Sequence, residues 1–313
     1  EVADPELREE IVSVPINERL MALARQWDWL LCELKERGFA YRIAFAELIN
    51  EMGWPPVSCT EEQTRPQTFE EWVAGIYPPS DDALTRDLAA KALAFLQERH
   101  PDILFTVDLG KARMFAQLLP DNAQVADHHV YTDGVAQAIL QAAGVGVGQW
   151  PETGPDLEAN EVLRSLLKPD PVPWQEIVRA GEGTHPHWLP VAWFYHNVDM
   201  EKYDRWCLEH FEEYRPRIEA SAREAFETAA AYARPRGLPM VVDEGYILFP
   251  PLRTRFVTTP DGRWGEEVCV EYAIATGHWG IIPTGYFRPN TPVWYDDDQC
   301  AWVAGVNRRI LES

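Results

Sequence analysis

The sequence contains few cysteines, and their spacing follows no recognisable pattern. The chain has five of them and no Cys-x-x-Cys pair. Such an odd and scattered set argues against a disulfide framework and against a structural zinc site, and free thiols suit a reducing compartment. We therefore expect a cytoplasmic location. The five positions are Cys32, Cys59, Cys207, Cys269 and Cys300.

Long apolar runs are missing, and positive charge is scarce. No stretch approaches the roughly 18 apolar residues that a membrane-spanning helix needs. The chain carries 28 Lys and Arg residues against 50 Asp and Glu residues, a formal net charge of −22. Because such a surface repels phosphate backbones and anionic lipids, we expect neither nucleic acid nor membrane as a partner. Nothing in the sequence indicates an oligomeric state.

The length and hydrophobic content allow a substantial core. The chain has 313 residues, of which 46% are hydrophobic and 12% aromatic, including 13 Trp residues. This size fits one α/β barrel or two smaller domains. We treat residues 1–313 as a single domain.

Helical and strand patterns alternate along the chain. Apolar residues at helical spacing predict helices over Asn17–Arg37, Asp81–Arg99, Lys111–Leu119, Met200–Arg234, Glu266–Thr276 and Gln299–Leu311. Short apolar segments predict buried strands over Tyr41–Ile49, Ile103–Leu109, Gln124–Tyr131, Pro239–Asp243 and Trp279–Phe287. The stretch Thr132–Val198 is rich in Gly, Pro and Trp, which predicts an irregular insertion. This alternation is typical of βαβ units with a parallel sheet.

Five strands are fewer than a closed (β/α)₈ barrel needs. We therefore expect a barrel that lacks its first three βα units in this chain, with the long insertion following its sixth strand. Barrels of this kind have about 250 residues plus insertions, so we expect roughly another 100 residues before Glu1.

Polar side chains follow the predicted strands where each strand ends. They are Asn50-Glu51, Asp108, His129 with Tyr131, and Asp243-Glu244. Active sites of parallel barrels are built at this end, from residues of several strands. We expect Asp108 to have a structural role instead, as the cap of the helix that starts near Lys111.

Two glutamates in this set suit glycosidic bond hydrolysis. Retention of configuration requires one carboxyl group that protonates the leaving oxygen and a second, about 5–5.5 Å away, that attacks the anomeric carbon. Glu51 and Glu244 are the best placed pair. Glu47 lies on the same predicted strand as Glu51, but it is deeper and has no preceding Asn, so we prefer Glu51.

Three motifs together resemble those of the large superfamily of retaining (β/α)₈-barrel glycoside hydrolases. Asn50-Glu51 resembles the Asn-Glu pair that ends its fourth strand, and His129-Val130-Tyr131 resembles the His-x-Tyr of its sixth strand. Asp243-Glu244-Gly245-Tyr246 resembles the nucleophile segment of its seventh strand. The closing segment, Trp279 to Leu311, is similar to the end of bacterial cellulase-like sugar-binding proteins.

The resemblance implies a role for each matching residue. Glu51 would be the general acid/base and Glu244 the nucleophile. Asn50 would bind the sugar 2-hydroxyl, and His129 and Tyr131 would line the site. The substrate would be an oligosaccharide or glycoside, without a cofactor or metal. The superfamily's Trp platform after the eighth strand is missing, so the further candidates for substrate binding are Tyr246, Tyr286 and Trp294.

Two other functions remain open at this point. A metal-dependent sugar isomerase or epimerase would also place carboxylates and imidazoles at strand ends, and Glu51, Asp127, His129 and Glu244 could hold Mn²⁺ or Mg²⁺. That hypothesis assigns no role to Asn50. A non-catalytic carbohydrate-binding protein is the other alternative, and the presence of both glutamates argues against it.

Overall fold

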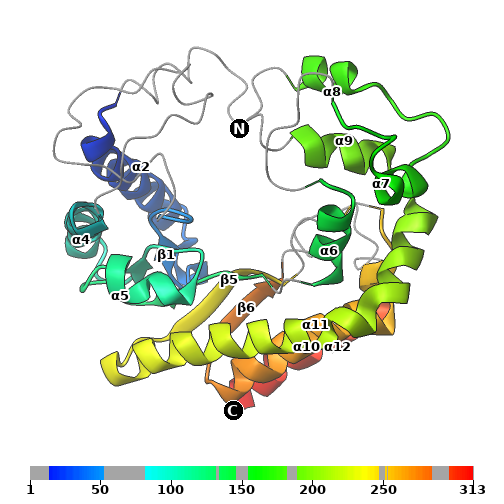
Figure 1. Ribbon diagram of the computed structural model, residues 1–313. Helices are drawn as coiled ribbons and strands as arrows, with labels where there is room; N and C mark the ends of the chain where they lie inside the picture. Colours follow the sequence, from blue (N-terminus) through cyan, green and yellow to red (C-terminus); the bar gives the residue numbers. More distant parts are fainter. Residues whose placement is uncertain are drawn as a thin grey trace.

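The structure is a computed structural model with an α/β fold. It describes residues 14–52, 82–131, 134–145, 154–181, 189–246, 251, 253–283 and 296–312. The helices of residues 16–36, 82–99 and 115–118 (α2, α4 and α5) lie to one side of the strands of residues 240–246 and 280–283 (β5 and β6). The helices α6 to α9, of residues 135–142, 161–166, 174–180 and 189–197, lie to the other side (Figure 1). The long helix α10 passes beneath these strands (Figure 1). No helix in the described ranges combines the length and the apolar character that crossing a bilayer requires.

The strands are short and parallel. They are β1 (Ala46–Glu47), β2 (Phe105–Thr106), β3 (Ala126–Asp127), β4 (Val130–Tyr131), β5 (Met240–Tyr246) and β6 (Gly280–Pro283). β1 pairs with β2, while β5 pairs with β3, β4 and β6. An isolated parallel bridge between Asp108 and Asp127 joins the two sheets. The spatial order β1, β2, β3, β5, β6 therefore follows the chain, as consecutive βαβ units predict.

The five strand positions agree with the predicted segments. The first three predicted segments were longer than the strands they contain, whereas β5 extends three residues beyond the predicted Pro239–Asp243. Residues Ala40–Arg42 form a 3₁₀ turn where a strand was expected. The predicted strand Gln124–Tyr131 is divided into β3 and β4, with His128 and His129 between them. A closed eight-stranded barrel is not seen in the ranges that the structure describes.

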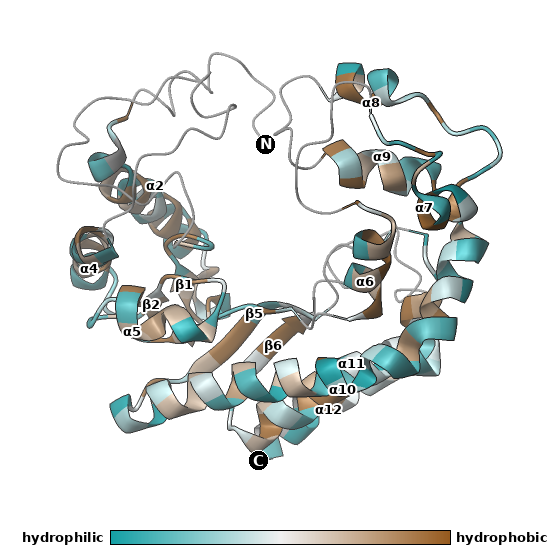
Figure 2. Cartoon of the chain, viewed as in Figure 1, coloured by the Kyte–Doolittle hydropathy of each residue, from teal (hydrophilic) through white to brown (hydrophobic). Residues whose placement is uncertain are grey.

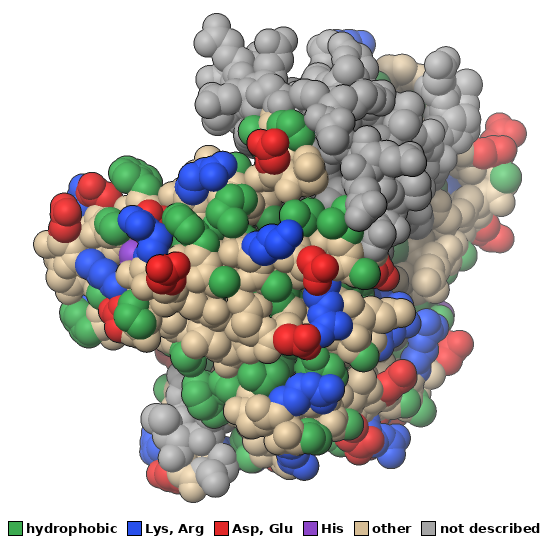
Figure 3. All heavy atoms as spheres, turned by 90° about the vertical axis from the view of Figure 1, so that its left-hand side faces the viewer, with side chains coloured by type: hydrophobic (Ala, Val, Ile, Leu, Met, Phe, Trp, Pro, Cys, Tyr) green, Lys and Arg blue, Asp and Glu red, His purple; other side chains and the backbone are tan. Residues whose placement is uncertain are grey.

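The first two helices build one core cluster. α2 (Ile16–Glu36) packs on α4 (Asp82–Arg99), and both match the predicted helices within one residue. α5 (Phe115–Leu118) follows a 3₁₀ turn at Ala112–Met114. Leu20, Leu31, Leu93 and Phe105 are among the fully buried side chains of this cluster. On the outer side of this region, acidic, basic and apolar side chains are mixed, so this face presents no continuous field of one sign (Figure 3).

The expectation that Thr132–Val198 is irregular was wrong for its described part. This stretch forms α6 (Val135–Ala142), α7 (Glu161–Leu166), α8 (Trp174–Ala180) and α9 (Leu189–Asn197). These helices have between six and nine residues, so each offers only about two turns of periodic signal. Trp174 and Trp193 are buried in a second core cluster, which also contains Tyr203, Cys207 and Phe211 of the following long helix.

Three long helices complete the fold. α10 (Met200–Ala233) is capped by Asp199, whose side chain accepts hydrogen bonds from the amides of Glu201 and Lys202. α11 (Pro260–Ala275) starts six residues before the predicted helix, because Thr259 caps it and Pro260 occupies its first position. α12 (Asp297–Glu312) closes the chain. A third core cluster, including Val130, Phe226 and Cys269, joins β4 and β5 to α10 and α11. Much of β5 and β6 is accordingly coloured as hydrophobic near the centre of Figure 2.

Candidate functional site

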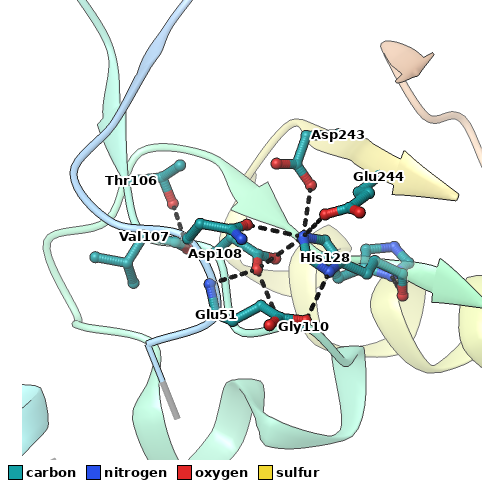
Figure 4. A network of polar contacts seen from close by, with 10 residues as sticks. Glu51, Thr106, Val107, Asp108, Gly110, His128, Asp243 and Glu244 are labelled. Carbon is teal, nitrogen blue, oxygen red and sulfur yellow. Dashed lines mark hydrogen bonds and ion pairs between the residues drawn. The ribbon is translucent and has the colours of Figure 1, made fainter. Parts of the chain in front are cut away.

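The polar side chains at the strand ends meet around one buried imidazole, that of His129. His129 lies between β3 and β4. Its ring contacts five polar side chains, of which Glu51, Asp108, Asp243 and Glu244 are labelled in Figure 4. They are Glu51 on Nδ1 at 3.2 Å, and Asp108, Asn50, Asp243 and Glu244 on Nε2 at 3.0, 3.0, 3.4 and 3.6 Å. Parallel pairing of β1, β2, β3 and β5 causes this convergence, since it brings their carboxyl ends to one edge.

His129 is positively charged at neutral pH. Burial alone would lower the pKa of its imidazole, because burial disfavours the charged form. Hydrogen bonds to Asp108 and Glu51, together with the negative charges of Asp108 and Asp243, outweigh burial and raise this pKa to about 11. His129 therefore acts as a fixed cation that holds carboxylates from three strands around it.

A bulge at the end of β1 projects Glu51 into the site. Asp108 donates its amide to the carbonyl of Ile49, and its own carbonyl accepts from Met52 rather than from Glu51. In a regular parallel ladder the carbonyl of Asp108 would accept from Glu51, so this segment contains one extra residue opposite Asp108. Glu51 has a φ of 52°, a left-handed conformation that is uncommon outside glycine. Such conformations persist only where the surroundings hold them, and they cluster at functional sites.

Asp108 supplies that support. Its Oδ2 atom accepts hydrogen bonds from the amides of Glu51 and Gly110, both at 2.9 Å, and it also contacts His129. The 3₁₀ turn near Lys111 has no side-chain cap. The predicted capping role of Asp108 was therefore wrong, and the residue instead fixes the backbone of Glu51.

Glu244 is held from the opposite side. Burial and a hydrogen bond to Glu244 raise the pKa of Tyr131 well above its usual value, so Tyr131 remains a neutral donor to this carboxylate. Gly245 lets the next strand come close, since a Cβ atom there would lie 2.9 Å from the carbonyl oxygen of Val130. The side chains of Glu244 and Glu51 are 27% and 40% exposed, so a ligand can reach both.

The carboxylates of Glu51 and Glu244 contact different nitrogens of the His129 ring. Glu51 Oε1 lies 3.2 Å from Nδ1, and Glu244 Oε2 lies 3.6 Å from Nε2. Their carboxyl groups are therefore closer together than the roughly 9.5 Å upper limit for two-carboxylate glycosidases. This arrangement is compatible with both the retaining and the inverting separation.

A second group of carboxylates lies beside this site. Glu47, Asp127 and Asp243 come from β1, β3 and β5, and their ligand oxygens lie within 4.8 Å of one another. Burial and the neighbouring carboxyl group of Asp243 raise the pKa of Glu47 to about 9 and that of Asp127 to about 10. From the sequence, Glu51 was preferred to Glu47 as a catalytic candidate. An ionisable residue inside a buried strand was the signal that could have drawn attention to it.

Of the remaining residues predicted to bind substrate, the structure describes Tyr246. Tyr246 is only 2% exposed and packs in the third core cluster, so its expected contact with substrate gains no support. Tyr286 and Trp294 lie outside the described residues. The four residues expected for a metal-dependent isomerase do not converge as one set, because Asp127 groups with Glu47 and Asp243 rather than with Glu51 and Glu244.

Comparison with known proteins supports the fold. No protein-family model matches the chain, and no curated protein matches it. A crystal structure from Parabacteroides distasonis, described as that of a "putative glycoside hydrolase", is similar, with a TM-score of 0.52 and 17% sequence identity. The similarity covers 93% of this chain and 62% of that chain, so this chain spans less than two thirds of that protein's length. At this identity the similarity concerns the fold.

Proposed function

We propose that this chain is a glycoside hydrolase that cleaves a β-glycosidic bond with retention, with Glu51 as acid/base and Glu244 as nucleophile. The observation that carries the proposal is the placement of both glutamates on one buried imidazole, His129. The similar fold of the Parabacteroides distasonis protein adds to it. We also take the five parallel strands as part of a (β/α)₈ barrel, since their order follows the chain and their functional ends coincide.

The neighbouring residues suit these roles. Glu244 attacks the anomeric carbon while Glu51 protonates the leaving oxygen, and water then hydrolyses the glycosyl-enzyme with Glu51 acting as base. Tyr131 and His129 both lie on Glu244 and orient its carboxylate. Asn50 is exposed beside His129, from where its amide can bind a sugar hydroxyl. Asp108 holds Glu51 in place through the backbone.

Replacement of Glu244 tests the nucleophile. Glu244→Gln should abolish turnover of aryl β-glycosides, because an amide cannot form the covalent intermediate. The change is nearly isosteric, so circular dichroism should show an unchanged fold. Glu209→Gln, an exposed change on α10, is the matched control and should retain full turnover. More than a few per cent of residual activity in Glu244→Gln would place the nucleophile elsewhere.

Chemical rescue tests the acid/base. Glu51→Ala should still be glycosylated by activated aryl glycosides, whose leaving groups need little protonation. Azide should then restore turnover and give a glycosyl azide of retained configuration, identified by NMR. An inverted azide would contradict the retaining mechanism, and no rescue would contradict the role of Glu51.

A further inference from the structure

Glu47, Asp127 and Asp243 form a compact group of oxygen ligands beside the proposed catalytic pair. They stand on three separate strands, β1, β3 and β5, so the backbone pairing of the sheet fixes their relative positions. Each can offer one carboxylate oxygen, and these atoms all lie within 4.8 Å of one another. Three carboxylates at this separation repel one another unless a proton or a cation lies between them.

Asp127 shows that the group lacks a partner. Its side chain is 0% exposed, and neither of its oxygens accepts a hydrogen bond from an N–H group or a hydroxyl of the described residues, so its polar neighbour is another carboxyl group, that of Asp243. Buried carboxylates are otherwise almost always hydrogen-bonded, paired, or bound to a metal. Asp127 is directed at Glu47 and Asp243, so the missing partner belongs between these three side chains.

Cationic side chains do not fill this role in the described ranges. No Lys or Arg forms an ion pair there with Glu47, Asp127 or Asp243. His129 is the nearest cation, 3.4 Å from Asp243, but both of its ring nitrogens already face other carboxylates. For the same reason the imidazole is a poor metal ligand, which leaves a site made of oxygens alone.

We propose that Glu47, Asp127 and Asp243 bind a divalent cation, with calcium preferred. Calcium takes carboxylate oxygens at about 2.3–2.6 Å in flexible geometry, so two of its ligands stand at most about 4.6–5.2 Å apart. Magnesium requires shorter distances and a near-ideal octahedron. The site is beyond the proposed hydrolase chemistry, does not rest on it, and runs against the sequence-based expectation that the protein binds no metal.

The first experiment uses the whole chain, freed of metal with EDTA and dialysed. Isothermal titration calorimetry with CaCl₂, MgCl₂ and MnCl₂ should show one calcium site per chain that binds magnesium more weakly. At a calcium concentration about 100-fold above the Kd, the Tm should rise by about 5 °C. No substrate is present, so failure of the hydrolase proposal would not affect this result.

Substitutions of the proposed ligands test whether calcium binds at these three carboxylates. Asp127→Asn should weaken calcium binding by more than the roughly 10–100-fold that loss of an outer-sphere partner causes. Asp87→Asn, an exposed change on α4, should bind calcium as the unaltered protein does, which separates the site from general attraction to an acidic surface. Glu47→Gln, at a half-buried position, is the second variant in case Asp127→Asn does not fold.

Two results would overturn the proposal. One is a folded protein, as judged by circular dichroism, that gives neither heat nor a change in Tm with any of the three cations. The other is a folded Asp127→Asn or Glu47→Gln variant with undiminished calcium affinity.

Discussion

His128 and His129 are neighbours in the sequence, yet they lie in opposite environments. They connect β3 to β4, and successive side chains of an extended chain point to opposite faces. His129 faces the carboxylates of the candidate site, where its pKa is raised to about 11. His128 faces the helices, where burial lowers its pKa to about 4. One residue type therefore supplies a cation on one face of the sheet and a neutral core group on the other.

The helix-facing side holds a buried pair of imidazoles. His128 Nε2 lies 3.2 Å from Nε2 of His278, and both rings pack edge-on against Phe226. Burial, together with the neighbouring His128 imidazole and the charge of Arg234, lowers the pKa of His278 to about 2. A neutral pair can share one hydrogen, with one ring donating and the other accepting. The comparison shows that the surrounding charges and burial, rather than the residue type, set the protonation state.

The largest expected effect comes from removing the cation of the carboxylate-facing side. His129→Gln leaves the buried carboxylate of Asp108 without its ion pair, and breaking a buried pair in this way costs about 3–5 kcal/mol. Urea denaturation measures this loss. His210→Gln, on α10, is the control and should cost less than about 1 kcal/mol. Equal costs in the two variants would contradict the central position of His129.

A smaller effect is expected in the pH dependence of stability, to which the neutral imidazole of His278 contributes. His278 has a lowered pKa, so below its unfolded value of 6.5 only the unfolded chain takes up the proton. Acidification from about pH 6.5 to pH 5 should therefore cost the unaltered protein about 2 kcal/mol more than it costs His278→Gln. Urea denaturation at both pH values tests this. The same slope in both proteins would mean that His278 is not a neutral buried group.

The smallest expected effect comes from the support of the imidazole pair. Thr276 Oγ1 lies 2.9 Å from Nδ1 of His278, and Thr276→Val removes this hydrogen bond at nearly constant volume. The free energy of unfolding should fall by about 1 kcal/mol. Turnover should not change, since the pair lies on the helix-facing side. A loss of activity in this variant would show that the two faces are coupled.

Much of the fold could be predicted from local patterns. The helices α2, α4 and α10 and the order of the five strands followed from apolar spacing, because each pattern is long or repeated enough to exceed chance. The short helices α6 to α9 could not be predicted in this way. Their apolar residues are buried in one cluster, where α6 and α7 contact α10 and α8 contacts α9, and a six-residue helix has almost no periodicity of its own.

The candidate site was predicted in outline and corrected in its connections. Asn50, Glu51, His129, Tyr131 and Glu244 do converge, as their positions at parallel strand ends indicated. The link from Asp108 to the amide of Glu51 depends on a one-residue bulge in the ladder. No local pattern reveals such a bulge, because it is defined only relative to the partner strand.

Local chemistry thus accounts for which segments are helices and strands and for the polar ends of those strands. The meeting of Glu47, Asp127 and Asp243, the unpartnered state of Asp127 and the opposite charges of His128 and His129 depend on tertiary structure. These features are set by strand register and by burial, which place residues distant in the chain within a few ångströms of one another. Protonation and ligand binding depend on the distances between these residues and on their burial, and neither quantity can be read from a single residue in the sequence.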